Sequence, residues 1–308
     1  MMKVCMVGVG SIAKRHIINI KEILGEDAVQ VDVFRRTESI PLSQEIQNII
    51  SNCYTSIEEM DKDYDVIFIT NPTEKHRDTL LMFQNHTKAF FVEKPVFSCS
   101  GDLSEFKKDL IYYVACPLRY TEIIQYVKNN ISPENVLSVR CISSSYLPDW
   151  RPGIDYRNTY SAHKNLGGGV ALDLIHEWDY LTYLFGFPIK TCGMMKRVSD
   201  LDIDCEDIAL YLAEYNDKLA EIHLDYFGRQ PIRLLELYLK DETIICDLIE
   251  SSISFLREGR KISFKEKRND FYKKELEHFL KIINEETDND NNLFHANHVL
   301  QLAEGKAE

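Results

Sequence analysis

The sequence predicts an α/β chain of two domains, with a doubly wound parallel sheet in residues 1–117 and an α+β domain in residues 118–308. Its 308 residues exceed the size of one ordinary domain and suffice for two hydrophobic cores. Short apolar runs alternate with helical patterns in the first domain, as they do in parallel sheets. Beyond Pro117 several strand-like segments follow one another directly, which predicts a large, mostly antiparallel open sheet.

The elements expected in the first domain alternate between strand and helix. Apolar runs bounded by turn residues predict strands at residues 3–9, 29–34, 65–70, 89–92 and 112–116. Apolar residues at helical spacing predict helices at residues 12–24, 43–50 and 74–85. Because helices join most of these strands, the strands are expected to be parallel.

The second domain is expected to contain more strand than helix. A helix at residues 122–129 and a strand at 136–146 precede a long loop rich in Trp, Arg, Pro and Tyr, and another helix starts near Gly169. Further strands are expected at residues 191–199, 207–215, 220–227, 234–240, 243–248 and 252–256. Closing helices at residues 271–284 and 296–303 flank an acidic turn, which we expect to be solvated.

The charge of the chain argues against two classes of partner. Lys and Arg number 36 and Asp and Glu number 49, so the net charge is −13. Because an acidic surface repels phosphate groups, we expect no nucleic-acid partner and no anionic membrane surface. There is no run of about 18 apolar residues, the length needed to cross a bilayer. The N-terminus also lacks the cleavage pattern of a signal peptide. The composition therefore favours a small-molecule ligand.

The eight cysteines are scattered along the chain and include no C-x-x-C pair. This spacing does not fit the usual zinc sites, so we expect no metal site. Several of the cysteines lie in apolar runs, as reduced core cysteines do. We therefore expect a cytoplasmic protein.

A glycine-rich motif lies between the first expected strand and the first expected helix. Residues 8–13 read G-V-G-S-I-A, which has the form G-x-G-x-x-A. Gly8 permits a tight turn, Gly10 lets the backbone approach a pyrophosphate, and Ala13 allows the helix to pack closely on the strand. Free N–H groups at the helix start bind phosphates. The motif predicts a dinucleotide site in a Rossmann domain; the alternative is a structural glycine turn. The candidate cofactor residues are Gly8, Gly10, Ser11 and Ile12.

The end of the second expected strand carries two arginines, Arg35 and Arg36. A carboxylate at this place would bind the ribose 2′-hydroxyl of NAD, whereas a basic residue accommodates the 2′-phosphate of NADP. Asp32 lies too early in the strand for that role. We therefore predict a preference for NADP(H), with NAD(H) as the alternative cofactor. The arginines would otherwise simply project into solvent.

Two further polar segments follow strands of the first domain, where ligands bind in open α/β sheets. The third expected strand runs into Thr70-Asn71-Pro72, followed by His76, and the fourth runs into Glu93-Lys94-Pro95. The glycine turn, the Asn-Pro…His segment and the Glu-Lys-Pro tripeptide together resemble the glucose–fructose oxidoreductase/inositol dehydrogenase (Gfo/Idh/MocA) family. This resemblance adds six candidate cofactor residues: Thr70, Asn71, Pro72, His76, Glu93 and Lys94.

Two segments of the second half extend the resemblance over nearly the whole chain. Leu118-Arg119-Tyr120 is similar to the family's Arg-aromatic crossover, and residues 167–176, G-G-G-V-A-L-D-L-I-H, are similar to its Gly-Gly-Gly…Asp…His helix. Family members commonly place the His four residues after the Asp. Here the gap between Asp173 and His176 is three, and we expect the pair to share one helical face, as i and i+3 neighbours do.

The resemblance implies a pyridine-nucleotide oxidoreductase that acts on sugars, cyclitols or sugar nucleotides, with Lys94, Asp173 and His176 around the reacting carbon. Alcohol oxidation requires removal of the hydroxyl proton as hydride leaves, and an imidazole such as that of His176 suits this general-base role. Asp173 would orient the ring or bind the substrate. Lys94 would donate a hydrogen bond to the developing oxyanion or serve in a proton relay. The alternative for His176 is an ordinary, satisfied helix histidine.

The loop at residues 146–161 supplies aromatic rings and arginines just before the predicted catalytic helix. Aromatic planes stack on sugar rings, and guanidinium groups bind carboxylates or phosphates. The loop is similar to loops of family members in sialic-acid-like sugar pathways, which favours an acidic or nucleotide-linked sugar. The alternative is a loop that packs domains or subunits together. The candidate substrate residues are Arg119, Tyr120, Trp150, Arg151, Tyr156 and Tyr160.

Two alternatives to a dehydrogenase are a non-catalytic regulator and an α/β hydrolase. A non-catalytic, dinucleotide-binding regulator or sensor would use the same fold, but Lys94, Asp173 and His176 together favour the enzyme. An α/β hydrolase would need a G-x-S-x-G motif, which the sequence lacks. A large open sheet in the second domain also offers a subunit interface, so we expect a homodimer or homotetramer.

Overall fold

The computed structural model describes residues 1–37 and 41–306 and divides the chain into two compact units. Unit 1 contains residues 1–97, 101–115 and 272–297, and unit 2 contains residues 98–100, 116–271 and the C-terminal segment from 298. The sequence predicts one boundary near residue 117. The units differ from that prediction chiefly because residues 272–297 lie in unit 1.

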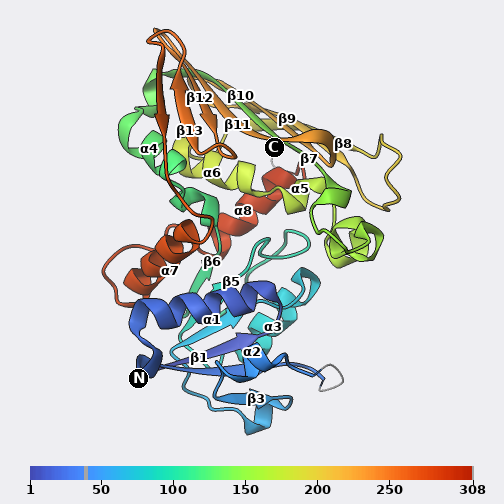
Figure 1. Cartoon of the computed structure of the whole chain (residues 1–308), viewed down its shortest axis with the longest axis vertical. Helices are drawn as coiled ribbons and strands as arrows, with labels where there is room; N and C mark the ends of the chain where they lie inside the picture. Colours follow the sequence, from blue (N-terminus) through green and yellow to red (C-terminus); the bar gives the residue numbers. More distant parts are fainter. Residues whose placement is uncertain (38–40, 307–308) are drawn as a thin grey trace. The chain divides into compact units, whose positions relative to one another are not determined.

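Unit 1 is built on a six-stranded parallel sheet with the strand order β3-β2-β1-β4-β5-β6 (Figure 1). The order reverses between β1 and β4, so the sheet is doubly wound as predicted. Its strands are β1 Met2–Val7, β2 Val29–Phe34, β3 Asn52–Tyr54, β4 Val66–Ile69, β5 Ala89–Val92 and β6 Ile111–Val114. Its helices are α1 Ser11–Leu24, α2 Gln44–Gln47, α3 His76–Phe83 and most of α7 Asp270–Ile283. The short strand β3 is not among the predicted strands.

Helix α7 lies in unit 1 because its apolar face packs on the parallel sheet. The ring of Phe279 lies 5.2 Å from that of Phe91, 5.5 Å from that of Tyr113 and 6.3 Å from that of Phe68. Phe279 is fully buried. The amphipathic pattern predicts a helix here, but such a pattern does not say which sheet the helix covers.

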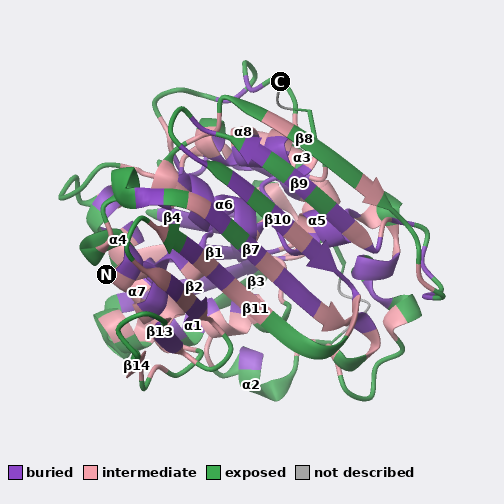
Figure 2. Ribbon diagram, turned by 90° about the horizontal axis from the view of Figure 1, so that it is seen from above, coloured by how far each residue is buried: buried purple, intermediate pink, exposed green. Residues whose placement is uncertain are grey.

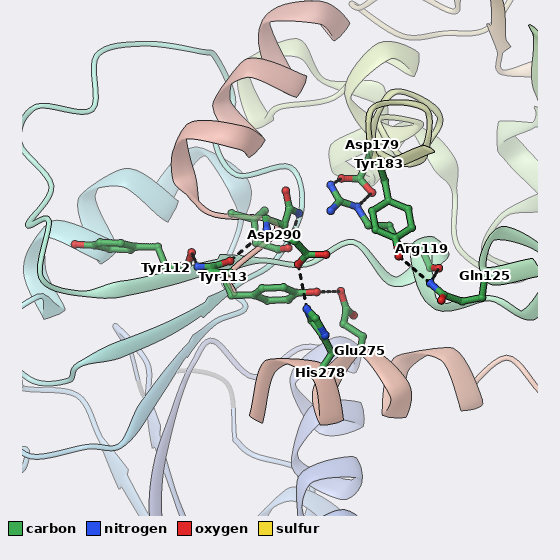
Figure 3. Close-up of polar contacts among 12 residues, drawn as sticks. Tyr112, Tyr113, Arg119, Gln125, Asp179, Tyr183, Glu275, His278 and Asp290 are labelled. Carbon is green, nitrogen blue, oxygen red and sulfur yellow. Dashed lines mark hydrogen bonds and ion pairs between the residues drawn. The ribbon is translucent and has the colours of Figure 1, made fainter. Parts of the chain in front are cut away.

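The edge strand β6 is paired by the segment that follows α7. The backbone N–H of Val114 donates to the carbonyl of Asn291 (2.9 Å), and the Asn291 side chain donates back to the Val114 carbonyl (2.8 Å). Figure 3 shows two side-chain contacts nearby, between Tyr113 and Glu275 and between His278 and Asp290. The acidic turn is therefore not simply solvated, because it covers a sheet edge.

Unit 2 is built on an eight-stranded sheet with the strand order β14-β13-β12-β11-β7-β10-β9-β8. Among these neighbours only β7 and β10 run parallel, so the predicted antiparallel character is confirmed. The strands are β7 Val136–Tyr146, β8 Lys190–Lys196, β9 Ile208–Glu214, β10 Leu219–Asp225, β11 Phe227–Leu239, β12 Thr243–Asp247, β13 Ser252–Phe255 and β14 Arg260–Ser263. The last of these, β14, is not among the predicted strands.

The two faces of this sheet differ. Along β10 the residues Ala220, Ile222 and Leu224 are buried, while Leu219 and Glu221, which alternate with them, are exposed. Figure 2 shows the same alternation of buried and exposed bands on β9 and β10. The helices of unit 2 are α4 Glu122–Asn130, α5 Val170–Asp173, α6 His176–Phe185 and the end of α8 Leu293–Ala303.

The helix that the sequence predicts from Gly169 is two helices in the structure. Helix α5 ends at Asp173 and α6 begins at His176, because the backbone at Leu174 (φ −98°, ψ 31°) leaves the helical region. The expectation that Asp173 and His176 are i, i+3 neighbours on one helix is therefore wrong. Neither Leu174 nor Ile175 is a helix breaker, and both are buried, so packing rather than local sequence decides the break.

Candidate active site

The glycine turn after β1 interlocks with the turn after β4. Gly8 has φ +97°, and a Cβ at this position would lie 2.8 Å from the Cα of Asn71. The hydroxyl of Thr70 donates to the carbonyl oxygens of Val7 (3.0 Å) and Gly8 (3.1 Å). Only glycine combines this backbone conformation with this close approach.

Gly10 leaves the start of α1 open. It is the N-cap residue of that helix, and no side chain caps the first turn. A Cβ on Gly10 would meet nothing within 4 Å, and Gly10 and Ser11 are both exposed. The first N–H groups of a helix attract anions through their orientation and the helix dipole. The turn therefore has room for the pyrophosphate of a dinucleotide beside Gly10, in space that a larger side chain at this position would occupy.

Asn71 and His76 form a small buried network beside this turn. The Asn71 side-chain amide donates to the hydroxyl of Thr79 (2.8 Å), whereas its Oδ1 is buried without a hydrogen bond. The ring of His76 lies between the carbonyl oxygens of Asn71 (2.9 Å) and Val96 (3.1 Å). Burial lowers the pKa of His76 despite these two carbonyl contacts. His76 thus joins two loops, and Oδ1 of Asn71 is a buried acceptor of this network that lacks a hydrogen-bond partner.

Glu93, directly after β5, is engaged with helix α1. Its carboxylate lies 2.6 Å from Nε2 of His16, which is itself fully buried. Burial opposes ionisation of Glu93, but the hydrogen bond and charge of His16, with smaller effects of Lys94 and His76, outweigh it and lower the pKa of Glu93. Glu93 therefore anchors the strand end, and Lys94 beside it is partly exposed.

The end of β2 presents cations rather than a carboxylate. Asp32 is fully buried and accepts hydrogen bonds from Tyr64 (2.8 Å) and Asn52 (2.9 Å), so its carboxylate is used inside the unit. Arg35 follows the strand, with its backbone N–H on the Tyr54 carbonyl (3.0 Å) and its side chain half-buried. Arg36 is exposed.

In unit 2 the carboxylate of Asp173 is held by two tyrosines. The buried hydroxyl of Tyr226 donates to Oδ2 of Asp173 (2.6 Å), and the hydroxyl of Tyr160 also hydrogen-bonds to this carboxylate. Burial and the negative charge of Asp173 raise the pKa of both phenols, which therefore stay protonated as donors. The ring of Trp150 packs edge-on against Tyr226 at 5.2 Å between centroids.

A second carboxylate lies near the start of α5. Glu206 accepts a hydrogen bond from the backbone N–H of Ala171 (3.4 Å) and packs against Gly169, where a Cβ would overlap it. Burial raises the pKa of Glu206. His176, the first residue of α6, is half-buried.

Tyr226 and Glu206 are absent from the residues that the sequence predicts for the site. The alternation along β10 would have placed Tyr226 on the buried face with Leu224. No sequence pattern indicates that its hydroxyl meets Asp173.

Arg119 and Tyr120 are buried rather than open to a ligand. The guanidinium of Arg119 forms a two-pronged ion pair with Asp179 (2.9 and 2.7 Å), and its ring neighbour is Tyr183, at 5.0 Å (Figure 3). Gln125 donates to the carbonyl of Arg119 (2.7 Å). These contacts join the 117–120 turn to α6, so the structure gives Arg119 an architectural place instead of the predicted place against substrate.

The loop that precedes α5 is folded through contacts of its own. The indole N–H of Trp150 donates to the hydroxyl of Ser145 (2.9 Å). The guanidinium of Arg151 lies 5.1 Å from the ring centroid of Tyr160. The hydroxyl of Tyr156 accepts a hydrogen bond from the backbone N–H of Asp202 (3.1 Å). The loop therefore holds its aromatic rings in defined positions near Asp173.

The predicted residues are distributed over both units. Unit 1 contains the glycine turn, Arg35, Arg36, Asn71 with Pro72, His76, Glu93 and Lys94, whereas unit 2 contains Asp173, His176 and the aromatic loop. In the part of the chain that the structure describes, no group of three or more His, Cys, Asp or Glu side chains is arranged to hold a metal ion. No helix among the described residues is long and apolar enough to cross a membrane.

The comparison with protein families matches the N-terminal part of the chain. Residues 2–110 match the profile of the Gfo/Idh/MocA oxidoreductase family, which is described as having an NAD-binding Rossmann fold. No curated protein sequence matches the chain significantly.

Solved structures match the whole chain in fold. Levoglucosan dehydrogenase in complex with NADH has a TM-score of 0.84 at 15% identity, over 99% of this chain and 96% of that chain. The UDP-N-acetylglucosamine 3-dehydrogenase GnnA from Acidithiobacillus ferrooxidans has a TM-score of 0.77 at 17% identity, over 98% and 95%. The WlbA dehydrogenase from Bordetella pertussis, in complex with NADH and UDP-GlcNAcA, has a TM-score of 0.78 at 14% identity, over 99% and 96%.

The fold class and the family resemblance predicted from the sequence are thus confirmed. Residues 2–110 match the oxidoreductase family with an NAD-binding Rossmann fold, and the chain as a whole has the fold of levoglucosan dehydrogenase and of GnnA.

Proposed function

We propose that this chain is an NAD(P)-dependent dehydrogenase that acts on a hydroxyl-bearing carbon of a sugar-type substrate. One observation carries the proposal: the open start of α1, at a glycine turn interlocked with Asn71, lies in a domain that matches an NAD-binding oxidoreductase family. Three similar folds support a substrate of this class: levoglucosan dehydrogenase, a UDP-N-acetylglucosamine 3-dehydrogenase, and the WlbA dehydrogenase, whose solved structure contains UDP-GlcNAcA.

Unit 1 would hold the cofactor. The backbone at Gly8, Gly10, Ser11 and Ile12 would bind the pyrophosphate, and the unused Oδ1 of Asn71 would accept a hydrogen bond from the cofactor. Arg35, with Arg36, would bind a 2′-phosphate, which favours NADP(H) over NAD(H). When bound, the nicotinamide ring supplies the hydride acceptor or donor.

The proton of the substrate hydroxyl would be removed by His176, since a neutral imidazole is a suitable base near neutral pH. The carboxylate of Asp173, fixed by Tyr226 and Tyr160, would orient the substrate or the imidazole. The ammonium group of Lys94 would donate a hydrogen bond to the oxygen on which negative charge develops.

The aromatic loop would supply most of the substrate contacts. Trp150, Arg151, Tyr156 and Tyr160 keep the proposed substrate role, because all four lie in the loop that leads to Asp173. Arg119 does not, because its guanidinium is buried against Asp179. Glu93 and His76 would position the loops of the cofactor site.

We further propose that the chain forms a homodimer through the exposed face of the unit 2 sheet. The strand registers place six exposed apolar side chains on that face: Met194, Leu210, Leu212, Leu219, Ile232 and Tyr238. An apolar face of this extent marks an interaction surface. A second copy of the chain is the occupant we propose, because a two-fold axis would pair the face with itself.

We also propose a cytoplasmic location, which the eight free cysteine thiols support.

A titration followed by a turnover assay tests the proposed function. NADPH and NADH fluorescence would be followed on adding the protein, and reduction of both oxidised cofactors would then be measured with a panel of hexoses, cyclitols and UDP-sugars. Cofactor binding with turnover of a panel member is the expected result. Binding without turnover on any of these classes would favour the regulator, and absence of binding by both cofactors would overturn the proposal.

A further inference from the structure

Unit 2 contains a cavity that the proposed catalytic residues do not line. Its volume is about 340 Å³, within the range of ligand pockets. Its walls come from the end of β7, the start of β11, the segment 198–201 and the aromatic loop. Its lining includes Tyr146, Tyr156, Ser199, Asp200, Phe227 and Arg229.

The cation of this cavity is Arg229. Its guanidinium carbon lies 3.8 Å from the ring centroid of Tyr146, so the planar group is stacked and oriented. The Arg229 side chain makes no hydrogen bond or ion pair with another residue that the structure describes. All its N–H donors therefore remain available to an anion, and a guanidinium binds phosphate oxygens in pairs.

The other polar side chains of the cavity differ in what they can offer a ligand: one hydroxyl can still donate a hydrogen bond, and one carboxylate can only accept. The hydroxyl of Tyr156 already accepts from Asp202, so it has its proton left to donate. The hydroxyl of Ser199 already donates to Asp207 (2.5 Å). Asp200 is exposed, with no ion pair or hydrogen bond among the described residues, and a carboxylate only accepts. A ligand that satisfies Asp200 and Arg229 together needs both donor groups and an anionic group.

The rings of Tyr146, Tyr156 and Phe227 add apolar faces to these charges. Aromatic faces stack on the planar base of a nucleotide. A neutral sugar would leave the Arg229 guanidinium without a counter-charge. A small inorganic anion would leave the rings and Asp200 unused.

We propose that this cavity binds a nucleoside diphosphate, with the diphosphate on Arg229, the base against the aromatic rings and a base N–H or ribose hydroxyl on Asp200. The link between this cavity and catalysis rests on the proposed dehydrogenase function. If the cavity holds the nucleoside diphosphate part of the substrate, the substrate of the dehydrogenase is a nucleotide-linked sugar.

Two segments connect the cavity with the anchor of Asp173. Phe227 lines the cavity, while its neighbour Tyr226 donates to Asp173. Tyr156 lines the cavity, while Tyr160 of the same loop hydrogen-bonds to Asp173. A ligand seated at Tyr156 and Phe227 therefore touches the segments that hold the proposed catalytic carboxylate.

Isothermal titration calorimetry with UDP as the probe tests the proposal on the full chain. The variants are Arg229→Ala, Arg229→Lys and Tyr146→Leu, with Arg268→Ala as the control, since Arg268 is an exposed arginine of unit 2 outside the cavity. We expect UDP to bind the wild type, at least tenfold more weakly to Arg229→Ala, and with an intermediate loss to Arg229→Lys. Tyr146→Leu is expected to weaken binding as well, because it removes the ring on which the guanidinium stacks. The control is expected to bind as the wild type does.

Two results would overturn the proposal: a wild type that does not bind UDP, or an Arg229→Ala variant that binds it with wild-type affinity. A parallel titration with glucuronate identifies the competing chemistry. Glucuronate binding that depends on Arg229, without UDP binding, would assign the cavity to a sugar carboxylate instead. These titrations need neither cofactor nor turnover. A negative result with UDP would therefore not affect the proposed dehydrogenase function, which the NADPH titration tests. A negative NADPH titration would likewise not affect the assignment of the cavity.

Discussion

Asp173 is buried and Lys94 is partly exposed, which suits the different roles proposed for them: Asp173 as an orienting carboxylate and Lys94 as a hydrogen-bond donor to the reacting oxygen. Asp173 accepts hydrogen bonds from Tyr226 and Tyr160, both of which stay protonated because burial and the carboxylate raise their pKa. Such a carboxylate is fixed in place, as an orienting group must be. Lys94 is partly exposed and adjoins Glu93, whose carboxylate is already engaged by His16.

Replacing Lys94 with alanine tests its role at the reacting oxygen. We expect Lys94→Ala to lower turnover by about 10²–10³-fold, because one donor to a developing oxyanion typically contributes that much. The affinity for NADPH is expected to change little, since the pyrophosphate is bound by the glycine turn. Steady-state kinetics and a fluorescence titration measure the two effects. Unchanged turnover on the true substrate would remove Lys94 from the mechanism.

The cofactor preference depends on the single position after β2. We expect wild type to bind NADPH about tenfold or more tightly than NADH, because paired hydrogen bonds from a guanidinium to a phosphate contribute about 1.5–3 kcal/mol. Arg35→Ala should reduce this preference, and Arg36→Ala should reduce it less, since Arg36 is exposed. The ratio of the two dissociation constants is the readout. Equal affinities in the wild type, or a preference for NADH, would refute the assignment of Arg35.

The positions of the motif residues at strand ends could be predicted from the sequence, but the side chains that contact these residues could not. The glycine turn and the cation after β2 are local features, and the structure places them at strand ends as expected. Arg119 differs because its partner, Asp179, lies 60 positions along the chain, and burial of both groups makes their pairing obligatory. Tyr226 was missed for the same reason, since its contact with Asp173 is made only by the fold.

At the scale of elements, the turn between β1 and α1 offers a matched pair of substitutions. Gly8→Ala places a Cβ 2.8 Å from Asn71 in a backbone conformation that disfavours side chains. We expect it to lower the free energy of unfolding by about 2–4 kcal/mol. Gly10→Ala adds a Cβ that meets no described atom, so we expect a near-native stability but at least about tenfold weaker NADPH binding, or about 1.4 kcal/mol.

Denaturant unfolding and the fluorescence titration separate these two effects. A Gly10→Ala protein that binds NADPH as tightly as the wild type would contradict the placing of the phosphates at this turn. A Gly8→Ala protein of unchanged stability would contradict the interlocking of the two turns.

The elements themselves were predicted well where their signal is local. The strands β2 Val29–Phe34 and β5 Ala89–Val92 have the predicted bounds, because each is a buried apolar run with turn residues on both sides. The strands β3 and β14 were missed because they are short and largely exposed. The break between α5 and α6 has no glycine or proline to signal it, so it required the tertiary structure.

At the scale of the whole molecule, the exposed face of the unit 2 sheet predicts self-association. Leu212→Glu is expected to convert the dimer to a monomer, because burying an unpaired carboxylate costs about 3–5 kcal/mol. Leu256→Glu is the control, since Leu256 is an exposed leucine beyond the end of β13. Light scattering coupled to size exclusion gives the mass of each variant. A monomeric wild type, or a Leu212→Glu protein that stays dimeric, would contradict the proposed interface.

The proposed activity makes one claim about the whole molecule: hydride leaves a substrate carbon for a nicotinamide while His176 takes the hydroxyl proton. The pH dependence of alcohol oxidation, measured for wild type and His176→Asn, tests this claim most directly. Asparagine keeps the approximate size of the side chain but cannot accept a proton. We predict a wild-type rate that rises as an imidazole loses its proton, and a variant whose rate is lowered most at pH values where hydroxide cannot compensate. Identical pH profiles for the two proteins would contradict the account.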